Sequence, residues 1–163
     1  MSSVSPSAQP PASTSSDSLA STLPIVLALF AALDIGLALF MALAPHAFYT
    51  AIGPFGVSNP HYVRDVATFY GAIGLAMAVA VSRPSWRAPV LAVSTLQFAL
   101  HSLNHLIDIA RAHPAWAGYL DFFSLLGGTL ILGLLWRQAA AAERGSAAVS
   151  PAAPLPTPQR SPT

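Results

Sequence analysis

The stretch QFALHSLNHLID, residues 97–108, places five polar side chains inside a run that is otherwise apolar. They are Gln97, His101, Asn104, His105 and Asp108. The last four lie 4, 7, 8 and 11 positions after the first, which is the spacing of one face of a helix with about 3.6 residues per turn. The sequence therefore predicts one polar stripe along one side of a helix.

The two histidines of this stripe could bind a metal ion or exchange protons. His101 and His105 are four residues apart, so both imidazoles could reach one ion. Asp34 or Asp121 from a neighbouring segment could then complete a zinc, copper or iron site. A histidine beside a carboxylate in a low-dielectric cavity could instead act as acid and base on a lipid-soluble substrate, such as a quinone or a sterol-like molecule. Hydrogen bonding that only joins helices is the third explanation.

A haem bound by two histidines needs axial ligands on facing helices. The two histidines inside an apolar segment share one segment, and His46, His61 and His113 fall in the connections. A haem would therefore require a dimer interface or a shallow site that uses His61.

The composition explains why the stripe is unusual. The 163-residue chain is 54% hydrophobic and 8% charged, with a mean hydropathy of +0.59, whereas soluble domains carry about 25% charged residues. It has no cysteine, which excludes disulfides and thiolate sites. A net charge of +1 gives no indication of nucleic acid binding. We therefore expect an all-α integral membrane protein whose main partner is the lipid bilayer.

Four apolar segments are each near the length of about 20 residues that crosses a membrane as a helix. The predicted spans are residues 23–44, 63–82, 88–110 and 117–136. Short connections at 83–87 and 111–116 favour antiparallel neighbours, so the expected fold is an up-and-down four-helix bundle over residues 22–138. The Ser/Pro/Ala-rich ends, residues 1–21 and 139–163, are predicted to be disordered tails, the second after a short helical extension.

Four further ionisable residues of the spans lie in the same half of the bundle, between its middle and one end. Asp34 lies near the middle of the first span, Arg64 and Asp65 begin the second, and Asp121 begins the fourth. Buried ionisable groups usually face a bundle interior or a water-filled cavity. Together with the stripe they predict a polar pocket in one half of the bundle, while the other half, with segments such as 71–81 and 125–136, stays apolar.

Arginine placement predicts the orientation. Five arginines lie on the side of both tails and the 83–87 connection, namely Arg83, Arg87, Arg137, Arg144 and Arg160. Only Arg64 and Arg111 lie on the other side. The positive-inside rule then places both termini in the cytoplasm and the polar half of the bundle outside.

Residues 59–109 also carry a pattern that is similar to a known group of proteins. Tyr62, Arg64 and Asp65 open the second span, Tyr70 follows, and a Pro/Arg turn leads to a third span of the form Q…H…NH..D. This pattern resembles uncharacterised actinobacterial four-helix integral membrane proteins of the DoxX-like or domain-of-unknown-function type. The resemblance implies a compact bundle in the bacterial inner membrane. It implies no established activity, and it supplies no catalytic residues that could be carried over to this chain.

The sequence thus predicts a small multi-pass membrane protein with a His/Asp-lined pocket for a small ligand, a metal ion or a lipid-soluble cofactor such as haem or quinone. Two alternatives stay open. The chain could be a membrane enzyme with acid–base or redox chemistry on a lipid-soluble substrate. It could also be a structural subunit of a membrane complex, or form a homo-oligomer.

Overall fold

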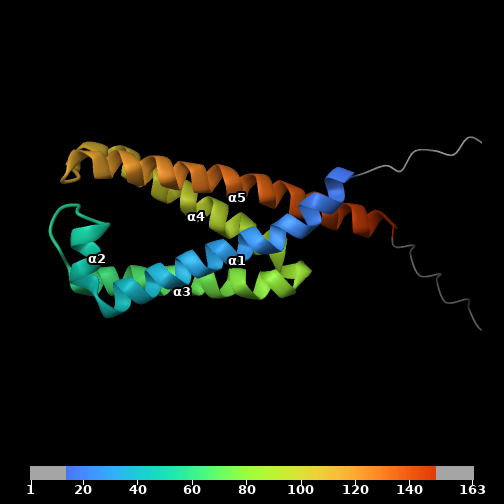
Figure 1. Ribbon diagram of the computed structural model, residues 1–163, viewed down its shortest axis with the longest axis horizontal. Helices are drawn as coiled ribbons and strands as arrows, with labels where there is room; N and C mark the ends of the chain where they lie inside the picture. Colours follow the sequence, from blue (N-terminus) through green and yellow to red (C-terminus); the bar gives the residue numbers. More distant parts are fainter. Residues whose placement is uncertain (1–13, 150–163) are drawn as a thin grey trace, which may run out of the picture.

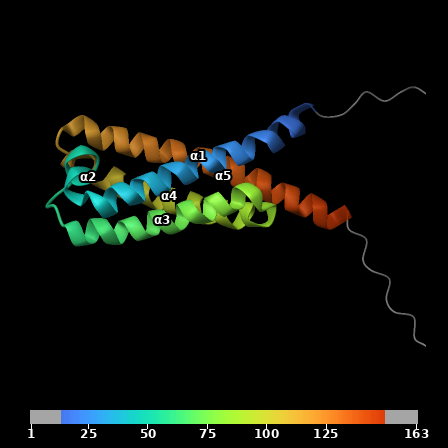
Figure 2. The same cartoon turned by 60° about the horizontal axis from the view of Figure 1, so that its bottom comes forward.

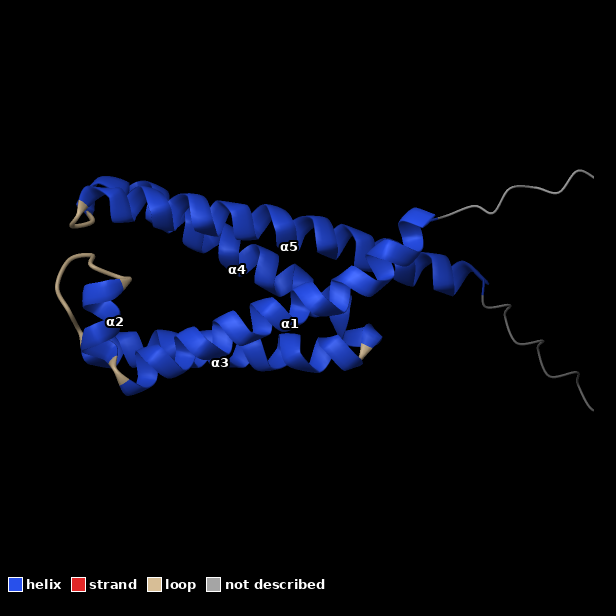
Figure 3. Cartoon of the chain, viewed as in Figure 1, coloured by secondary structure: helices blue, strands red, loops and turns tan. Residues whose placement is uncertain are grey.

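The computed structural model describes residues 14–149, which contain helices and loops and, within that range, no strand (Figure 3). The helical segments are α1 (Thr14–Leu43), α2 (Pro45–Ala51), α3 (Pro60–Ser82), η1 (Pro84–Trp86), α4 (Arg87–Asp108), η2 (Ile109–Arg111) and α5 (Ala115–Val149). The predicted all-α, up-and-down four-helix bundle is confirmed.

Four helices are long and apolar enough to cross a membrane. The candidate spans are Ser21–Leu43, Pro60–Ser82, Pro84–Arg111 and Ala115–Ser146. Each contains one of the four spans predicted from the sequence, to within a residue at its ends. The chain therefore has the architecture of a multi-pass membrane protein.

Two helices extend into the predicted tails. Residues 14–21 belong to α1, and α5 passes residue 138, where a short helical extension was predicted, and ends at Val149. Once a helix exists, each further residue adds a hydrogen bond without a new nucleation cost, and the alanines after Gln138 favour helix. Residues 1–13 and 150–163 of the predicted tails lie outside the described part of the chain.

The long helices are arranged as two pairs. α1 packs along α3 and α4 packs along α5, while the two pairs contact each other chiefly between α3 and α4. The pairs diverge toward the end of the bundle that carries α2 (Figure 1). We call this the α2 end and the opposite end, where η1 joins α3 to α4, the η1 end. A view turned by 60° shows that the long helices lie roughly along one common axis (Figure 2).

An apolar core joins the two pairs toward the η1 end. It includes the fully buried Leu27, Met77, Leu91 and Leu132, one from each long helix. This cluster lies in the half of the bundle that was predicted to be apolar.

Large apolar side chains cover the outside of the helices. Leu29, Leu75 and Leu130 expose 65%, 61% and 61% of their surface. An apolar surface of this extent is unfavourable in water but suits lipid chains. The outer face of the bundle is therefore built for contact with a bilayer.

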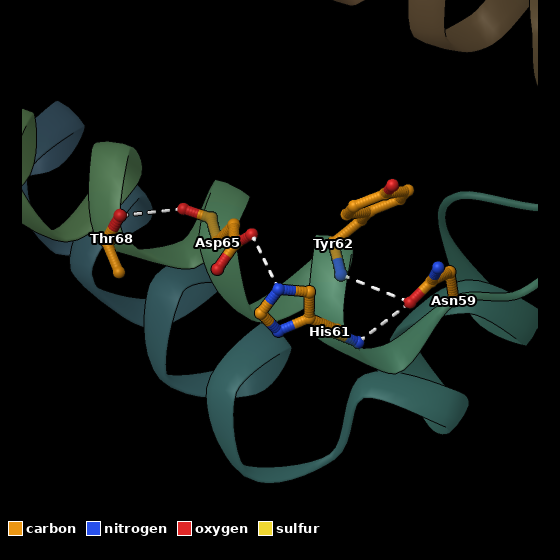
Figure 4. A network of polar contacts seen from close by, with 5 residues as sticks. All are labelled: Asn59, His61, Tyr62, Asp65 and Thr68. Carbon is orange, nitrogen blue, oxygen red and sulfur yellow. Dashed lines mark hydrogen bonds and ion pairs between the residues drawn. The ribbon is translucent and has the colours of Figure 1, made fainter.

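The start of α3 is fixed by a local cap (Figure 4). The Asn59 side-chain Oδ1 accepts hydrogen bonds from the backbone N–H groups of His61 and Tyr62, at 3.1 and 3.4 Å, and Pro60 occupies the first helical turn. These bonds satisfy two of the free donors at a helix start. The cap therefore sets where α3 begins.

Candidate functional site

A cavity of about 750 Å³ lies between the two helix pairs at the α2 end. Its α1, α2 and α3 walls are mostly apolar and aromatic, with Leu33, Leu37, Met41, Phe48, Ile52, Val63, Val66, Phe69 and Ile73. Its α4 and α5 wall carries the polar residues Gln97, His101, Asn104, His105, Asp121 and Ser124. The cavity thus has one mostly apolar side and one side that can form hydrogen bonds.

The predicted stripe on α4 forms most of the polar wall. Gln97, His101, Asn104 and His105 all line the cavity, as the helical spacing predicts. Asp108 does not line it; its carboxylate pairs with the Arg111 guanidinium at 3.0 Å. The stripe is therefore continuous over four of its five residues and ends in a surface ion pair.

The two histidines stack on each other in the middle of this wall. Their ring centroids are 4.8 Å apart, and the Nε2 atoms of His101 and His105 lie 2.9 Å from each other. A contact this short between two imidazoles requires one nitrogen to carry the proton and the other to accept it. The pair is therefore a hydrogen bond whose direction is set by which of the two imidazoles carries the Nε2 proton.

Tyr70 of α3 completes the polar group from across the cavity. Its hydroxyl lies 3.1 Å from Nδ1 of His101, and the Gln97 amide nitrogen lies 3.5 Å from the same atom. Tyr70 was not predicted to line the pocket. Its position far from either end of the span could have indicated this role, because a buried phenolic hydroxyl usually finds a hydrogen-bond partner.

Asp121 approaches the other end of the histidine pair. Its Oδ2 atom is 4.0 Å from Nδ1 of His105, and neither atom has a hydrogen-bond partner among the described residues. Phe55, in the loop after α2, stands edge-on to the His105 ring with centroids 5.0 Å apart. This loop residue was also missed, because nothing in its local sequence indicates a distant contact.

Asp34 is buried but lies outside the cavity lining. Its side chain is 1% exposed, and its Oδ1 atom has no partner among the described residues. Asp34 packs against Gly74 of α3: a Cβ atom added at Gly74 would lie only 3.0 Å from the Cβ atom of Asp34. Asp34 thus sits in the α1–α3 interface, behind the wall, and not among the pocket residues as predicted.

Two further predicted pocket residues lie away from the cavity. The Arg64 Nε atom donates to the carbonyl of Ala42 at 3.4 Å, and Asp65 pairs with His61 at 3.4 Å on the exposed side of α3 (Figure 4). Neither residue lines the cavity. Both residues lie at the start of a span, where charged side chains reach water at little cost.

The residues present do not form a complete metal site. No group of three or more His, Asp or Glu side chains that could hold a metal occurs within residues 14–149. His101 and His105 offer two nitrogens, while Asp121 approaches His105 at its other nitrogen. The predicted metal site keeps its two histidines but gains no third ligand.

Comparison of the chain with protein-family models, curated proteins and solved structures finds no significant match. The resemblance to DoxX-like proteins therefore stays a prediction, and the function is inferred from the geometry of the cavity.

Proposed function

We propose that this protein is a small multi-pass membrane protein that binds an amphipathic, lipid-soluble ligand in the cavity at the α2 end. The apolar body of the ligand lies against α1 and α3, and its polar end meets the α4–α5 wall. The volume of about 750 Å³ falls in the usual range of small-molecule sites, roughly 300–1,000 Å³.

Unpaired polar atoms in the wall carry this proposal. Gln97 Oε1, His105 Nδ1 and Asp121 Oδ2 are buried without a hydrogen-bond partner among the described residues, and all three residues line the cavity. An unpaired buried polar atom costs about 1–3 kcal/mol. Residues that only hold helices together would be paired with one another, so a ligand that supplies the missing hydrogen bonds explains the arrangement better.

Photolabelling tests the site directly. The probe is a long-chain alcohol that carries a diazirine, added to protein in mild detergent, with labelled residues mapped by mass spectrometry. We expect labels on cavity residues of α3 and α4. Ser124→Trp, which fills the cavity from α5, should abolish them, whereas Ala78→Trp on the exposed side of α3 should not. Equal labelling of cavity and outer face in both variants would refute the site.

A second measurement identifies the natural ligand class. Compounds that co-purify with wild-type protein are extracted and compared by mass spectrometry with those of Ser124→Trp and Ala78→Trp. We expect a hydroxyl- or carbonyl-bearing lipid, of which a quinone is one type, that Ser124→Trp loses and Ala78→Trp retains. Elemental analysis of the same samples tests for a metal held by His101 and His105.

The proposed location is the bacterial inner membrane with both termini in the cytoplasm, from the arginine distribution and the DoxX-like resemblance. Because the chain has no cysteine, single cysteines can report the orientation. Arg83→Cys at the η1 end should react with a membrane-impermeant maleimide only after cells are permeabilised, and Arg111→Cys at the α2 end should react in intact cells. The opposite pattern would invert the topology.

A further inference from the structure

The polar groups of the cavity form a chain that runs across three helices. It leads from Tyr70 on α3, through His101 and His105 on α4, to Asp121 on α5. The successive separations are 3.1, 2.9 and 4.0 Å. All four residues line the cavity.

The hydrogen bonds of this chain point in one direction. The Gln97 amide nitrogen can only donate, so we assign His101 Nδ1 as the acceptor, and the Tyr70 hydroxyl near the same atom as a second donor. A neutral imidazole carries its proton on the other nitrogen. His101 Nε2–H therefore donates to His105 Nε2, and the proton of His105 is left on Nδ1, the atom that faces the Asp121 carboxylate.

One link of the chain is open. His105 Nδ1 and Asp121 Oδ2 face each other at 4.0 Å, and both are buried and unpaired among the described residues. A hydrogen bond between such atoms needs a separation of about 2.7–3.2 Å, so a shift of roughly 1 Å between α4 and α5 side chains closes it. The two atoms can therefore bond either to a ligand in the cavity or, after that shift, to each other.

We propose that Tyr70, His101, His105 and Asp121 form a proton relay that takes a proton from a hydroxyl-bearing ligand, of the phenol class, bound in the cavity. The ligand O–H gives its proton to the Tyr70 oxygen as the Tyr70 proton moves to His101 Nδ1. The proton on His101 Nε2 moves to His105 Nε2, and the proton on His105 Nδ1 moves to Asp121. The ligand becomes its oxyanion and Asp121 becomes neutral, so protons and charge balance. The relay rests on the ligand binding proposed above.

The surroundings of the relay leave Asp121 as the only described carboxylate at its end. Asp108 on the same side of α4 is already paired with Arg111 at 3.0 Å, and Asp65 on α3 is paired with His61 away from the cavity. Asp34 of α1 lies outside the cavity lining. The proton therefore has one defined acceptor.

The experiment uses 6-hexyl-2-naphthol as the probe, because its neutral and ionised forms absorb at different wavelengths. Binding to the full-length protein in mild detergent is measured first, by displacement of the diazirine alcohol label. The ratio of ionised to neutral bound probe is then measured at fixed pH. The variants are Asp121→Asn and Tyr70→Phe, which break the relay at either end. Their controls are Asp65→Asn and Tyr119→Phe, which change residues outside the cavity lining.

We expect the ionised-to-neutral ratio of bound probe to fall about tenfold in Asp121→Asn and in Tyr70→Phe, equivalent to one pH unit, and to stay unchanged in both controls. The ratio is taken over bound probe alone, so weaker binding in either variant does not change it. Simple repulsion from a carboxylate predicts the opposite sign for Asp121→Asn, because removing that charge would favour the bound anion. A ratio that is unchanged or higher in both variants, with binding intact, overturns the relay and leaves the binding proposal standing. Failure of the probe to bind wild-type protein overturns both.

Discussion

The ring of Phe55 stands at 86° to the imidazole of His105, with the ring centroids 5.0 Å apart. Phe55 belongs to the loop between α2 and α3, and His105 belongs to α4, so this contact links the two helix pairs at the end where they diverge. The loop is held by the Tyr49 hydroxyl, which donates to the Gly56 carbonyl at 2.6 Å. A short loop thus covers one side of the histidine pair.

Phe55→Ala should open the cavity at the α2 end. Loss of one aromatic contact is worth about 0.5–1.5 kcal/mol beyond the buried area, so we expect a modest drop in thermal stability and faster release of the diazirine alcohol. Release is measured by chase with unlabelled alcohol before photolysis. Val57→Ala, at a side chain that is 94% exposed in the same loop, is the control. Equal release rates in the two variants would show that Phe55 does not gate the cavity.

Gly128→Ala should force α5 away from α4. An added Cβ would lie 2.7 Å from two ring atoms of Phe98, and that ring is itself packed edge-on against Phe30. Overpacking of this kind costs about 1–3 kcal/mol, measured as the free energy of unfolding by SDS titration from mild detergent. Gly127→Ala is the matched control, because nothing lies within 4 Å of its added Cβ. Similar losses in both variants would contradict the packing argument.

Gly74→Ala should separate α1 from α3. Its Cβ would lie 2.8 Å from Ile35 Cγ1 and 3.0 Å from the Ile35 backbone nitrogen, and a backbone atom cannot turn aside as a side chain can. Small residues allow such close helix contacts in membranes. We expect a loss of about 1–3 kcal/mol in the same SDS titration. Gly36→Ala, with nothing within 4 Å, should be nearly neutral, and a variant of Gly74 as stable as wild type would be inconsistent with the contact.

Asn59→Ala should weaken the start of α3. It removes the acceptor for the N–H groups of His61 and Tyr62, and loss of such a cap costs about 0.5–2 kcal/mol. Asn59→Asp keeps an acceptor at the same place and should restore most of the stability. The measurement is thermal unfolding in mild detergent by circular dichroism. Equal melting temperatures for the alanine and aspartate variants would show that the cap contributes nothing.

Much of the fold is determined by the sequence. Apolar segments of membrane-spanning length have to be helical, because lipid offers no partner for backbone groups, and the short connections make neighbouring helices antiparallel. The spacing from Gln97 to His105 likewise fixes that these side chains share one face of α4. The extra turns of α1 and the full length of the α5 extension were not predicted, since helix ends depend on weak propensities rather than on a strong pattern.

Only the tertiary structure decided which residues of other helices and loops contact the polar stripe of α4. Asp34, Arg64 and Asp65 share a polar character with Asp121, but the rotation of α1 and α3 turns them to the helix interface or the outside, while Tyr70 and Phe55 turn toward the histidines. Periodicity fixes positions around one helix axis, whereas the rotation of one helix against another depends on close packing at sites such as Gly74 and Gly128. These contacts hold α1 against α3 and α4 against α5, and the cavity lies between the two pairs that they form.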